Sequence, residues 1–134
     1  MEITHDFPPN FTEIEDAFGS IPITIVFTYG DIIYAPGHGD ISEHLMIHEK
    51  IHSEQQGNDP EDWWKRYLTE SDFRLKQEVE AYYAQYSSFK RAHRDKNLQI
   101  RYLYQIAADL SSTIYGSIVT HREAMNLITQ GKRR

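Results

Sequence analysis

The chain has 134 residues, of which 40% are hydrophobic and 25% charged, and this size and composition indicate one globular domain spanning residues 1–134. It contains no cysteine, which excludes a disulfide framework and a cysteine zinc finger, so any metal must be bound by histidine, aspartate or glutamate. The formal net charge of −6 argues against broad binding of nucleic acid, and the short basic tail Lys132-Arg133-Arg134 is the one counter-signal.

The N-terminal region offers no targeting or membrane signal. Residues 1–6 lack the basic and apolar regions of a secretory signal. No apolar run approaches the roughly 20 residues that a membrane-spanning helix needs. We therefore expect a soluble, cytoplasmic protein without a membrane partner.

The first part of the chain predicts a β-hairpin. Residues 1–20 are polar and irregular, with room for a short helical turn over residues 12–18. Residues 23–29 are rich in β-branched and aromatic side chains, Gly30-Asp31 offers a turn, and residues 32–35 resume the β pattern. Pro36-Gly37 should end the hairpin.

The rest of the chain predicts helices. A helix capped by Asp40 or Ser42 should run to Gln56-Gly57, with Ile41, Leu45, Ile47 and Ile51 at near-helical spacing. Start and stop signals place further helices over residues 60–68, 71–92, 98–110 and 121–131. The predicted fold class is α+β, mainly helical, with the hairpin beside the helix that ends at Gln56.

That helix contains the sequence His48-Glu49-Lys50-Ile51-His52, an H-E-x-x-H pattern. Positions i and i+4 share one helix face, so both imidazoles can bind one Zn2+ ion while a coordination position is left to water. Glu49 lies about 100° round the helix from His48, near that water but not on the metal. Because zinc lowers the pKa of bound water toward about 7, Glu49 is the predicted general base. The alternative is two exposed histidines on a solvated face.

The third metal ligand should come from a later helix, and Glu78 and Glu80 are the leading candidates. They point roughly 200° apart, so only one can face the metal. Glu78 has the more apolar helix neighbours, and a carboxylate in such a setting needs a partner such as zinc, so Glu78 is preferred. His44 and Asp109 are weaker rivals.

A hydrogen-bond donor for the anionic oxygen of a hydrolytic reaction would complete such a site. Tyr104, Tyr115 and His121 are chemically suitable. The sequence gives no geometry that chooses among them.

The motif and the stretch Glu78-Val79-Glu80-Ala81-Tyr82 together resemble the gluzincin metallopeptidases, and the compact size is similar to that of minigluzincins and of small HExxH proteins encoded by phages and prophages. The resemblance covers about a third of the chain. It implies a zincin-like domain in which His48, His52 and Glu78 bind zinc and Glu49 is the base.

Two further features bear on this resemblance. Tyr82 stands where many gluzincins have an aspartate that hydrogen-bonds a ligand histidine. In that family a hairpin strand near the zinc also receives a peptide as an added strand, and here residues 31–35 would do so, as an exposed edge.

The sequence therefore predicts a zinc-dependent peptide-bond hydrolase that acts on a peptide or protein substrate. The alternatives are a non-catalytic zinc-binding structural or interaction protein and a cell-wall peptide amidase. Substrate specificity and oligomeric state are not readable from the sequence.

Overall fold

The computed structural model describes residues 1–131, so the tail Lys132-Arg133-Arg134 lies outside the described residues. The elements are β1 (Glu2–Thr4), α1 (Phe11–Phe18), β2 (Phe27–Tyr29), β3 (Ile32–Tyr34), α2 (Glu43–Gln56), α3 (Pro60–Thr69), α4 (Ser71–Ala92), α5 (Lys96–Leu110), a 3-10 turn (Thr113–Tyr115) and α6 (His121–Gln130). The α+β, mainly helical class is confirmed. No helix within residues 1–131 is long and apolar enough to cross a membrane.

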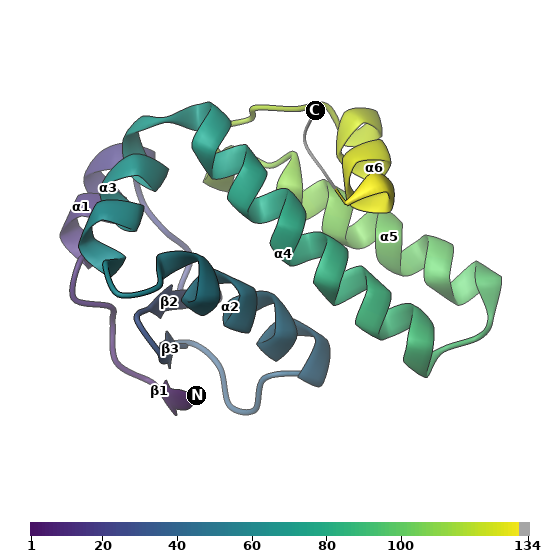
Figure 1. Cartoon of the computed structure of the whole chain (residues 1–134), viewed down its shortest axis with the longest axis horizontal. Coiled ribbons are helices and arrows are strands. Elements are labelled where there is room, and N and C mark those ends of the chain that lie inside the picture. Colours follow the sequence, from purple (N-terminus) through teal and green to yellow (C-terminus); the bar gives the residue numbers. More distant parts are fainter. Residues whose placement is uncertain (132–134) are drawn as a thin grey trace.

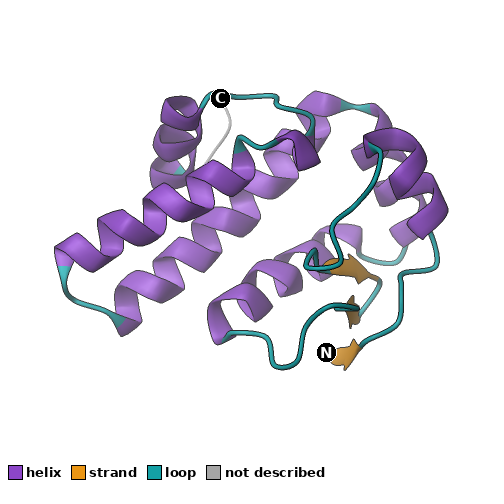
Figure 2. Cartoon of the chain, turned by 180° about the vertical axis from the view of Figure 1, so that it is seen from behind, coloured by secondary structure: helices purple, strands orange, loops and turns teal. Residues whose placement is uncertain are grey.

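The long helix α4 lies at the centre of the arrangement. Helices α5 and α6 pack on one side of it, and α2 packs on the other side, with the sheet beyond α2 (Figure 1). The view from behind shows the strands and α1 gathered at the α2 side of the molecule (Figure 2). Helix α2 is therefore enclosed between the sheet and α4.

The predicted hairpin is present, but its first strand is shorter than expected. Phe27 pairs with Tyr34 and Tyr29 with Ile32, around a turn in which Gly30 has a φ of 64° that favours glycine. Residues 23–25 do not extend the strand, because the backbone N–H of Ile25 bonds back to Pro22 in a turn and Ile23 is 59% exposed. The β-branched composition of this segment indicated a strand that tertiary packing does not supply.

The prediction that residues 31–35 form an exposed edge is wrong. Strand β1 pairs in parallel with β3, in the order β1-β3-β2, so β3 is the central strand. Sequence reasoning missed β1 because three residues carry too little pattern to identify a strand. The edge that faces α2 belongs to β2.

The helix boundaries follow the predicted capping residues closely. The side chain of Ser42 accepts from the N–H of Leu45 at the start of α2, and Asp59 accepts from Asp62 at the start of α3, ahead of Pro60. Thr120 and Glu123 form a capping box on α6. Helix α1 is a full helix of eight residues, where only a short turn was expected.

Two clusters of buried apolar side chains stabilise the fold. One joins α4 to α5 and α6 and includes Leu75, Val79, Ile106, Leu110 and Ile128. The other joins α1, β2 and α3 through Ile14, Phe27, Trp63, Trp64 and Tyr67. Helix α2 contributes to neither cluster, so its burial must rest on other contacts.

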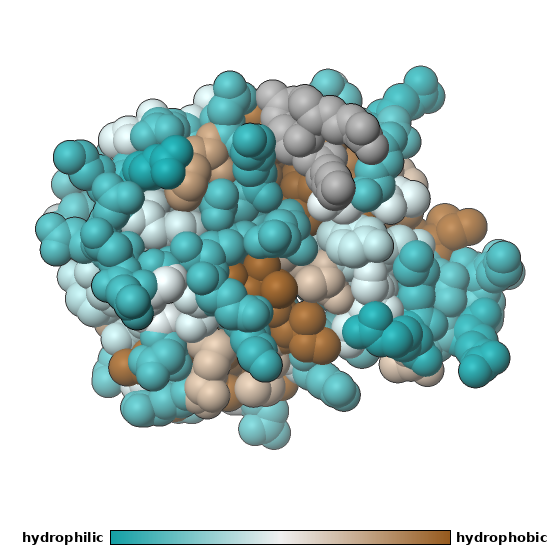
Figure 3. Space-filling model, in the orientation of Figure 1, coloured by the Kyte–Doolittle hydropathy of each residue, from teal (hydrophilic) through white to brown (hydrophobic). Residues whose placement is uncertain are grey.

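The buried face of α2 is polar. His48, Glu49, His52 and Gln56 are its buried residues, whereas Leu45, Ile47 and Ile51 are only partly covered. On the face shown in Figure 3, hydrophilic side chains dominate and a small apolar patch lies near the junction of α2 and α4. The apolar pattern that predicted this helix therefore does not mark its most buried side.

Candidate metal centre

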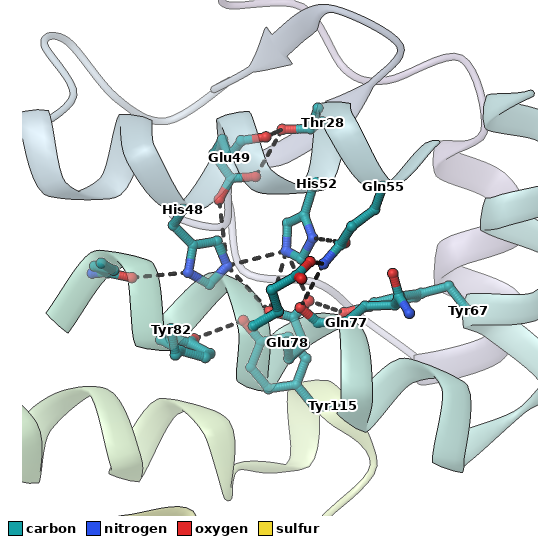
Figure 4. Close-up of polar contacts among 12 residues, drawn as sticks. Thr28, His48, Glu49, His52, Gln55, Tyr67, Gln77, Glu78, Tyr82 and Tyr115 are labelled. Atoms are coloured by element: carbon teal, nitrogen blue, oxygen red, sulfur yellow. Dashed lines mark hydrogen bonds and ion pairs between the residues drawn. The ribbon is translucent and has the colours of Figure 1, made fainter. Parts of the chain in front are cut away.

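Three ligand atoms from two helices meet in the interior of the molecule. The Nε2 atoms of His48 and His52 lie 3.1 Å apart, and Oε1 of Glu78 lies 3.1 Å from the first and 3.2 Å from the second. All three residues are at most 5% exposed. The histidines are one turn apart on α2, and Glu78 reaches them from α4, as Figure 4 shows.

This triangle has the dimensions of one face of a zinc coordination tetrahedron. Tetrahedral ligands about 2.0–2.1 Å from an ion are separated from one another by about 3.3 Å. The three ligand atoms of His48, His52 and Glu78 lie 3.1 to 3.2 Å apart. Two imidazoles and one carboxylate are also a donor set that zinc accepts in hydrolytic sites, so these residues fit a zinc ion.

The other ligand candidates lie elsewhere. Glu80 is exposed and accepts a hydrogen bond from Gln55 Nε2. His44 turns toward α4, where its Nδ1 lies 2.8 Å from the hydroxyl of Ser88 and its ring packs against Phe89. Asp109 is exposed on α5. Within residues 1–131, the group that could hold a metal consists of His48, His52 and Glu78.

Each histidine has its far nitrogen fixed by a glutamine. Nδ1 of His48 lies 2.9 Å from Gln85 Oε1, and Nδ1 of His52 lies 2.8 Å from Gln55 Oε1. An amide oxygen only accepts, so both imidazoles donate from Nδ1 and turn Nε2 toward the ligand triangle, where it can bind a metal ion once it carries no proton. The amide of Gln85 is held in turn, because its Nε2 donates to the hydroxyl of Tyr102.

Tyr82 takes no part in that hydrogen bonding. Its ring packs edge-on against His48, with the ring centres 4.4 Å apart. Gln85, three residues further along α4, is the residue whose side chain accepts from Nδ1 of His48.

Glu78 is anchored on its second oxygen. The hydroxyl of Tyr67 on α3 donates to Oε2 at 2.6 Å, and this oxygen also lies 3.1 Å from Nε2 of His52, while Oε1 lies beside both imidazoles. Burial opposes ionisation of Glu78, but the attraction of His52 and the hydrogen bonds from both imidazoles hold its pKa well below its usual range. The carboxylate is therefore charged and oriented before any ion binds.

Glu49 lies beside the triangle without joining it. Its Oε2 is 3.8 Å from Nε2 of His48, and its Oε1 accepts from the hydroxyl of Thr28 on β2 at 2.9 Å. Burial raises the pKa of Glu49, and the nearby imidazoles only partly offset this effect. A carboxylate with a raised pKa is suited to accept and return a proton near neutral pH.

The second histidine is strongly influenced by Glu78. Burial alone would lower the pKa of His52, but the charge and hydrogen bond of Glu78, helped by Glu49 and Gln55, raise it to about 9. A protonated imidazole cannot bind a metal, so an incoming ion must displace this proton.

A cavity of about 60 Å³ opens next to these groups. One wall holds His48, Glu49, His52 and Glu78, and the opposite walls are mainly apolar, with residues of α1, of the segment before β2 and of α3. Its apolar lining includes Ile14, Phe18, Ile21, Ile25, Phe27 and Ile114. Such a space, apolar with a few convergent polar groups, is typical of a small-molecule site.

Only one of the three predicted oxyanion donors reaches this cavity. Tyr115 lines it, and its hydroxyl lies 2.8 Å from that of Tyr82. Tyr104 is 60% exposed and its ring packs against that of His121, whose Nε2 lies 2.9 Å from the backbone oxygen of Tyr104. In Figure 4, Glu49 and Tyr115 lie on opposite sides of the ligand atoms.

Sequence reasoning missed the residues that orient the site: Thr28, Gln55, Gln56, Tyr67 and Gln85. A helical signal was available for three of them. Gln55 and Gln56 follow His52 by one turn on α2, and Gln85 is two turns after Glu78 on α4. Thr28 and Tyr67 come from other elements, and only the tertiary structure brings them to the site.

Comparison of the chain with models of known protein families, with curated proteins and with solved structures finds no match.

Proposed function

We propose that the protein is a zinc-dependent hydrolase of peptide or closely related amide bonds. His48, His52 and Glu78 would bind the metal, and Glu49 would act as the general base. The observation that carries this proposal is the position of Glu49, a buried carboxylate that lies beside the three ligand atoms but is not one of the metal ligands.

A purely structural metal site has no use for such a group. Glu49 is 4% exposed, and burying a carboxylate costs free energy unless it is paired. Among residues 1–131, the hydroxyl of Thr28 is the side-chain group that donates to it, and the ligand histidines are the charged groups beside it when they are protonated. Once the histidines bind a metal, the carboxylate is free to accept a proton, which supports a catalytic site over a structural one.

The roles of the chain's own residues follow from this arrangement. A zinc ion held by the three ligands would supply a Lewis acid and lower the pKa of a water molecule. Glu49 accepts a proton from water as the carbonyl is attacked and returns it to the leaving nitrogen. The hydroxyl of Tyr115, on the other side of the ligand group, donates to the oxygen that becomes anionic.

The same distribution of roles is found in the gluzincin metallopeptidases and the minigluzincins, which the sequence motif resembles. We include membership of that group in the proposal. The ligand triangle and the glutamine partners of both histidines support it, because they supply the metal site and the imidazole orientation that this chemistry requires.

Hydrolysis by the zinc-loaded wild type and by a Glu49→Gln variant tests the proposal. Mixed short and long peptides serve as substrates, and products are detected by mass spectrometry. Removing a general base lowers the rate by about 10²–10⁴-fold, while zinc content stays unchanged. Glu54→Gln is the matched control, since Glu54 lies exposed on the same helix. Zinc binding without any hydrolysis by the wild type would instead indicate a non-catalytic zinc protein.

A further inference from the structure

The edge of β2 is the strand edge closest to the candidate metal centre, and two of its outward-facing backbone groups are already hydrogen-bonded. At the outer edge of a sheet, alternate residues direct their backbone N–H and C=O groups outward, as Thr28 and Gly30 do here. The amide of Gln56 donates from Nε2 to the oxygen of Thr28 at 2.8 Å and accepts from the N–H of Gly30 at 2.7 Å.

This pair of hydrogen bonds reproduces the contacts of an added strand. In a parallel pair of strands, one residue of the added strand bonds to two residues of the edge strand. It donates to the carbonyl oxygen of the first and accepts from the N–H of the residue two positions later in that edge strand. The Gln56 carboxamide takes that place, and the indole N–H of Trp64 adds a second donor to Thr28 at 3.0 Å. Gln56 is 4% exposed and sits one turn after His52, so an extended peptide meets this cap directly beside the ligands.

The space beside the metal group is also small. A cavity of about 60 Å³ holds roughly four to six water molecules, which leaves room for an amide group and a small side chain. An extended polypeptide needs a groove that is open at both ends. The candidate metal ligands and base are not displayed in such a groove, because each of these residues is at most 5% exposed: His48, Glu49, His52 and Glu78.

We propose that the substrates are small amides of about dipeptide size, with an apolar side chain, and not internal bonds of an extended polypeptide. This inference rests on the proposed hydrolytic function and names its substrate class. The apolar walls at Ile14, Phe18 and Phe27 favour an apolar side chain, and the capped edge at Thr28 and Gly30 excludes the peptide strand.

The test compares the hydrolysis of the same peptide bond in a dipeptide and in a longer peptide. The zinc-loaded full chain is given Ala-Ala, Ala-Val and Ala-Leu, and longer peptides, capped at both ends, that hold the same bonds at their centres. We expect cleavage of the dipeptides at least about tenfold faster, in kcat/KM, than that of the long peptides. Equal or faster cleavage of the long peptides overturns the inference while leaving the proposed function intact. Cleavage of neither set overturns both.

A second arm tests the cap without relying on activity. Hydrogen exchange of the Gly30 amide should accelerate about fivefold in Gln56→Ala, the equivalent of one lost hydrogen bond. In the same variant, the ratio of kcat/KM for dipeptides to kcat/KM for long peptides should fall. Gln105→Ala, at an exposed position of α5, should change neither quantity. An unchanged Gly30 exchange rate in Gln56→Ala would overturn the role assigned to the cap.

Discussion

Two faces of α4 make contacts of opposite character. Toward α5 and α6, Leu75 and Val79 join an apolar cluster with Ile106, Leu110 and Ile128. Toward α2, the same helix presents Glu78 and Gln85, which meet buried polar groups. One interface is stabilised by removing apolar surface from water, whereas the other is held by a closed set of hydrogen bonds.

The apolar interface stabilises the fold, whereas the polar interface orients the side chains of the candidate metal centre. Apolar packing does not depend on the direction of individual contacts. In contrast, each buried polar group at the α2 interface needs a hydrogen-bond partner, because an unpaired one destabilises the protein. The α2 interface satisfies its imidazoles and Glu78 with side chains of α2, α3 and α4. Perturbing the two interfaces should therefore alter different measurable properties.

Truncation in the apolar interface should have the largest effect on stability. Leu110 is 1% exposed, so Leu110→Ala should lower the free energy of unfolding by about 2–5 kcal/mol in urea titrations. Zinc bound per folded chain should be unchanged. Leu98→Ala, at a position that is 37% exposed, is the control and should cost clearly less. Loss of zinc from folded Leu110→Ala protein would contradict the separation of the two interfaces.

Loss of a glutamine from the polar interface should instead weaken metal binding. Gln85→Ala removes the acceptor of His48 Nδ1 and should raise the zinc dissociation constant about 10–100-fold, or about 1.4–2.8 kcal/mol. Competition with a chelator measures it. Gln105→Ala, exposed on α5, should leave affinity unchanged. An equal effect in both variants would refute the orienting role of Gln85.

Zinc binding near neutral pH should release about one proton from His52. The pKa of this imidazole is raised to about 9, so it stays protonated at neutral pH in the metal-free protein. Affinity should therefore fall as pH falls below about 9. Calorimetric titration in buffers of different ionisation enthalpy counts the protons. Zinc binding at neutral pH without net proton release would contradict the assignment to His52.

The smallest expected effect is a gain in stability of the metal-free protein on Glu49→Gln. The pKa of Glu49 is higher in the folded protein than in the unfolded chain. Ionised Glu49 therefore lowers the free energy of unfolding at pH values above the unfolded-state pKa, and this loss disappears as Glu49 becomes protonated at lower pH. Glutamine keeps the oxygen that accepts from Thr28 but carries no charge. The gain should be present at neutral pH and vanish in acid, as measured by urea unfolding. A loss of stability at neutral pH would contradict this account.

Much of the helical framework could be predicted from local signals. Caps such as Ser42, Asp59 and Thr120 act within one turn, so their sequence neighbours are sufficient to place helix ends. The sheet was less predictable, because β1 gains its hydrogen bonds from β3, about 30 residues away in sequence. The edge assigned to residues 31–35 was wrong for the same reason.

The site could be predicted only where one helix carries the information. His48 and His52 share a face by their spacing, and Glu78 was preferred from its apolar neighbours; the structure places these three side chains together. Thr28, Tyr67 and Tyr115 lie on separate elements, and nothing local connects them to the motif. The cap formed by Gln56 on β2 depends equally on how α2 packs against the sheet.

Elemental analysis of purified protein after zinc reconstitution measures directly whether His48, His52 and Glu78 form a zinc site. We expect about one zinc per chain in the wild type and in Glu80→Ala, and essentially none in His48→Ala or Glu78→Ala. Circular dichroism confirms that each variant is folded. A wild type without zinc, or zinc that is retained by Glu78→Ala and lost from Glu80→Ala, would show that His48, His52 and Glu78 are not the zinc ligands.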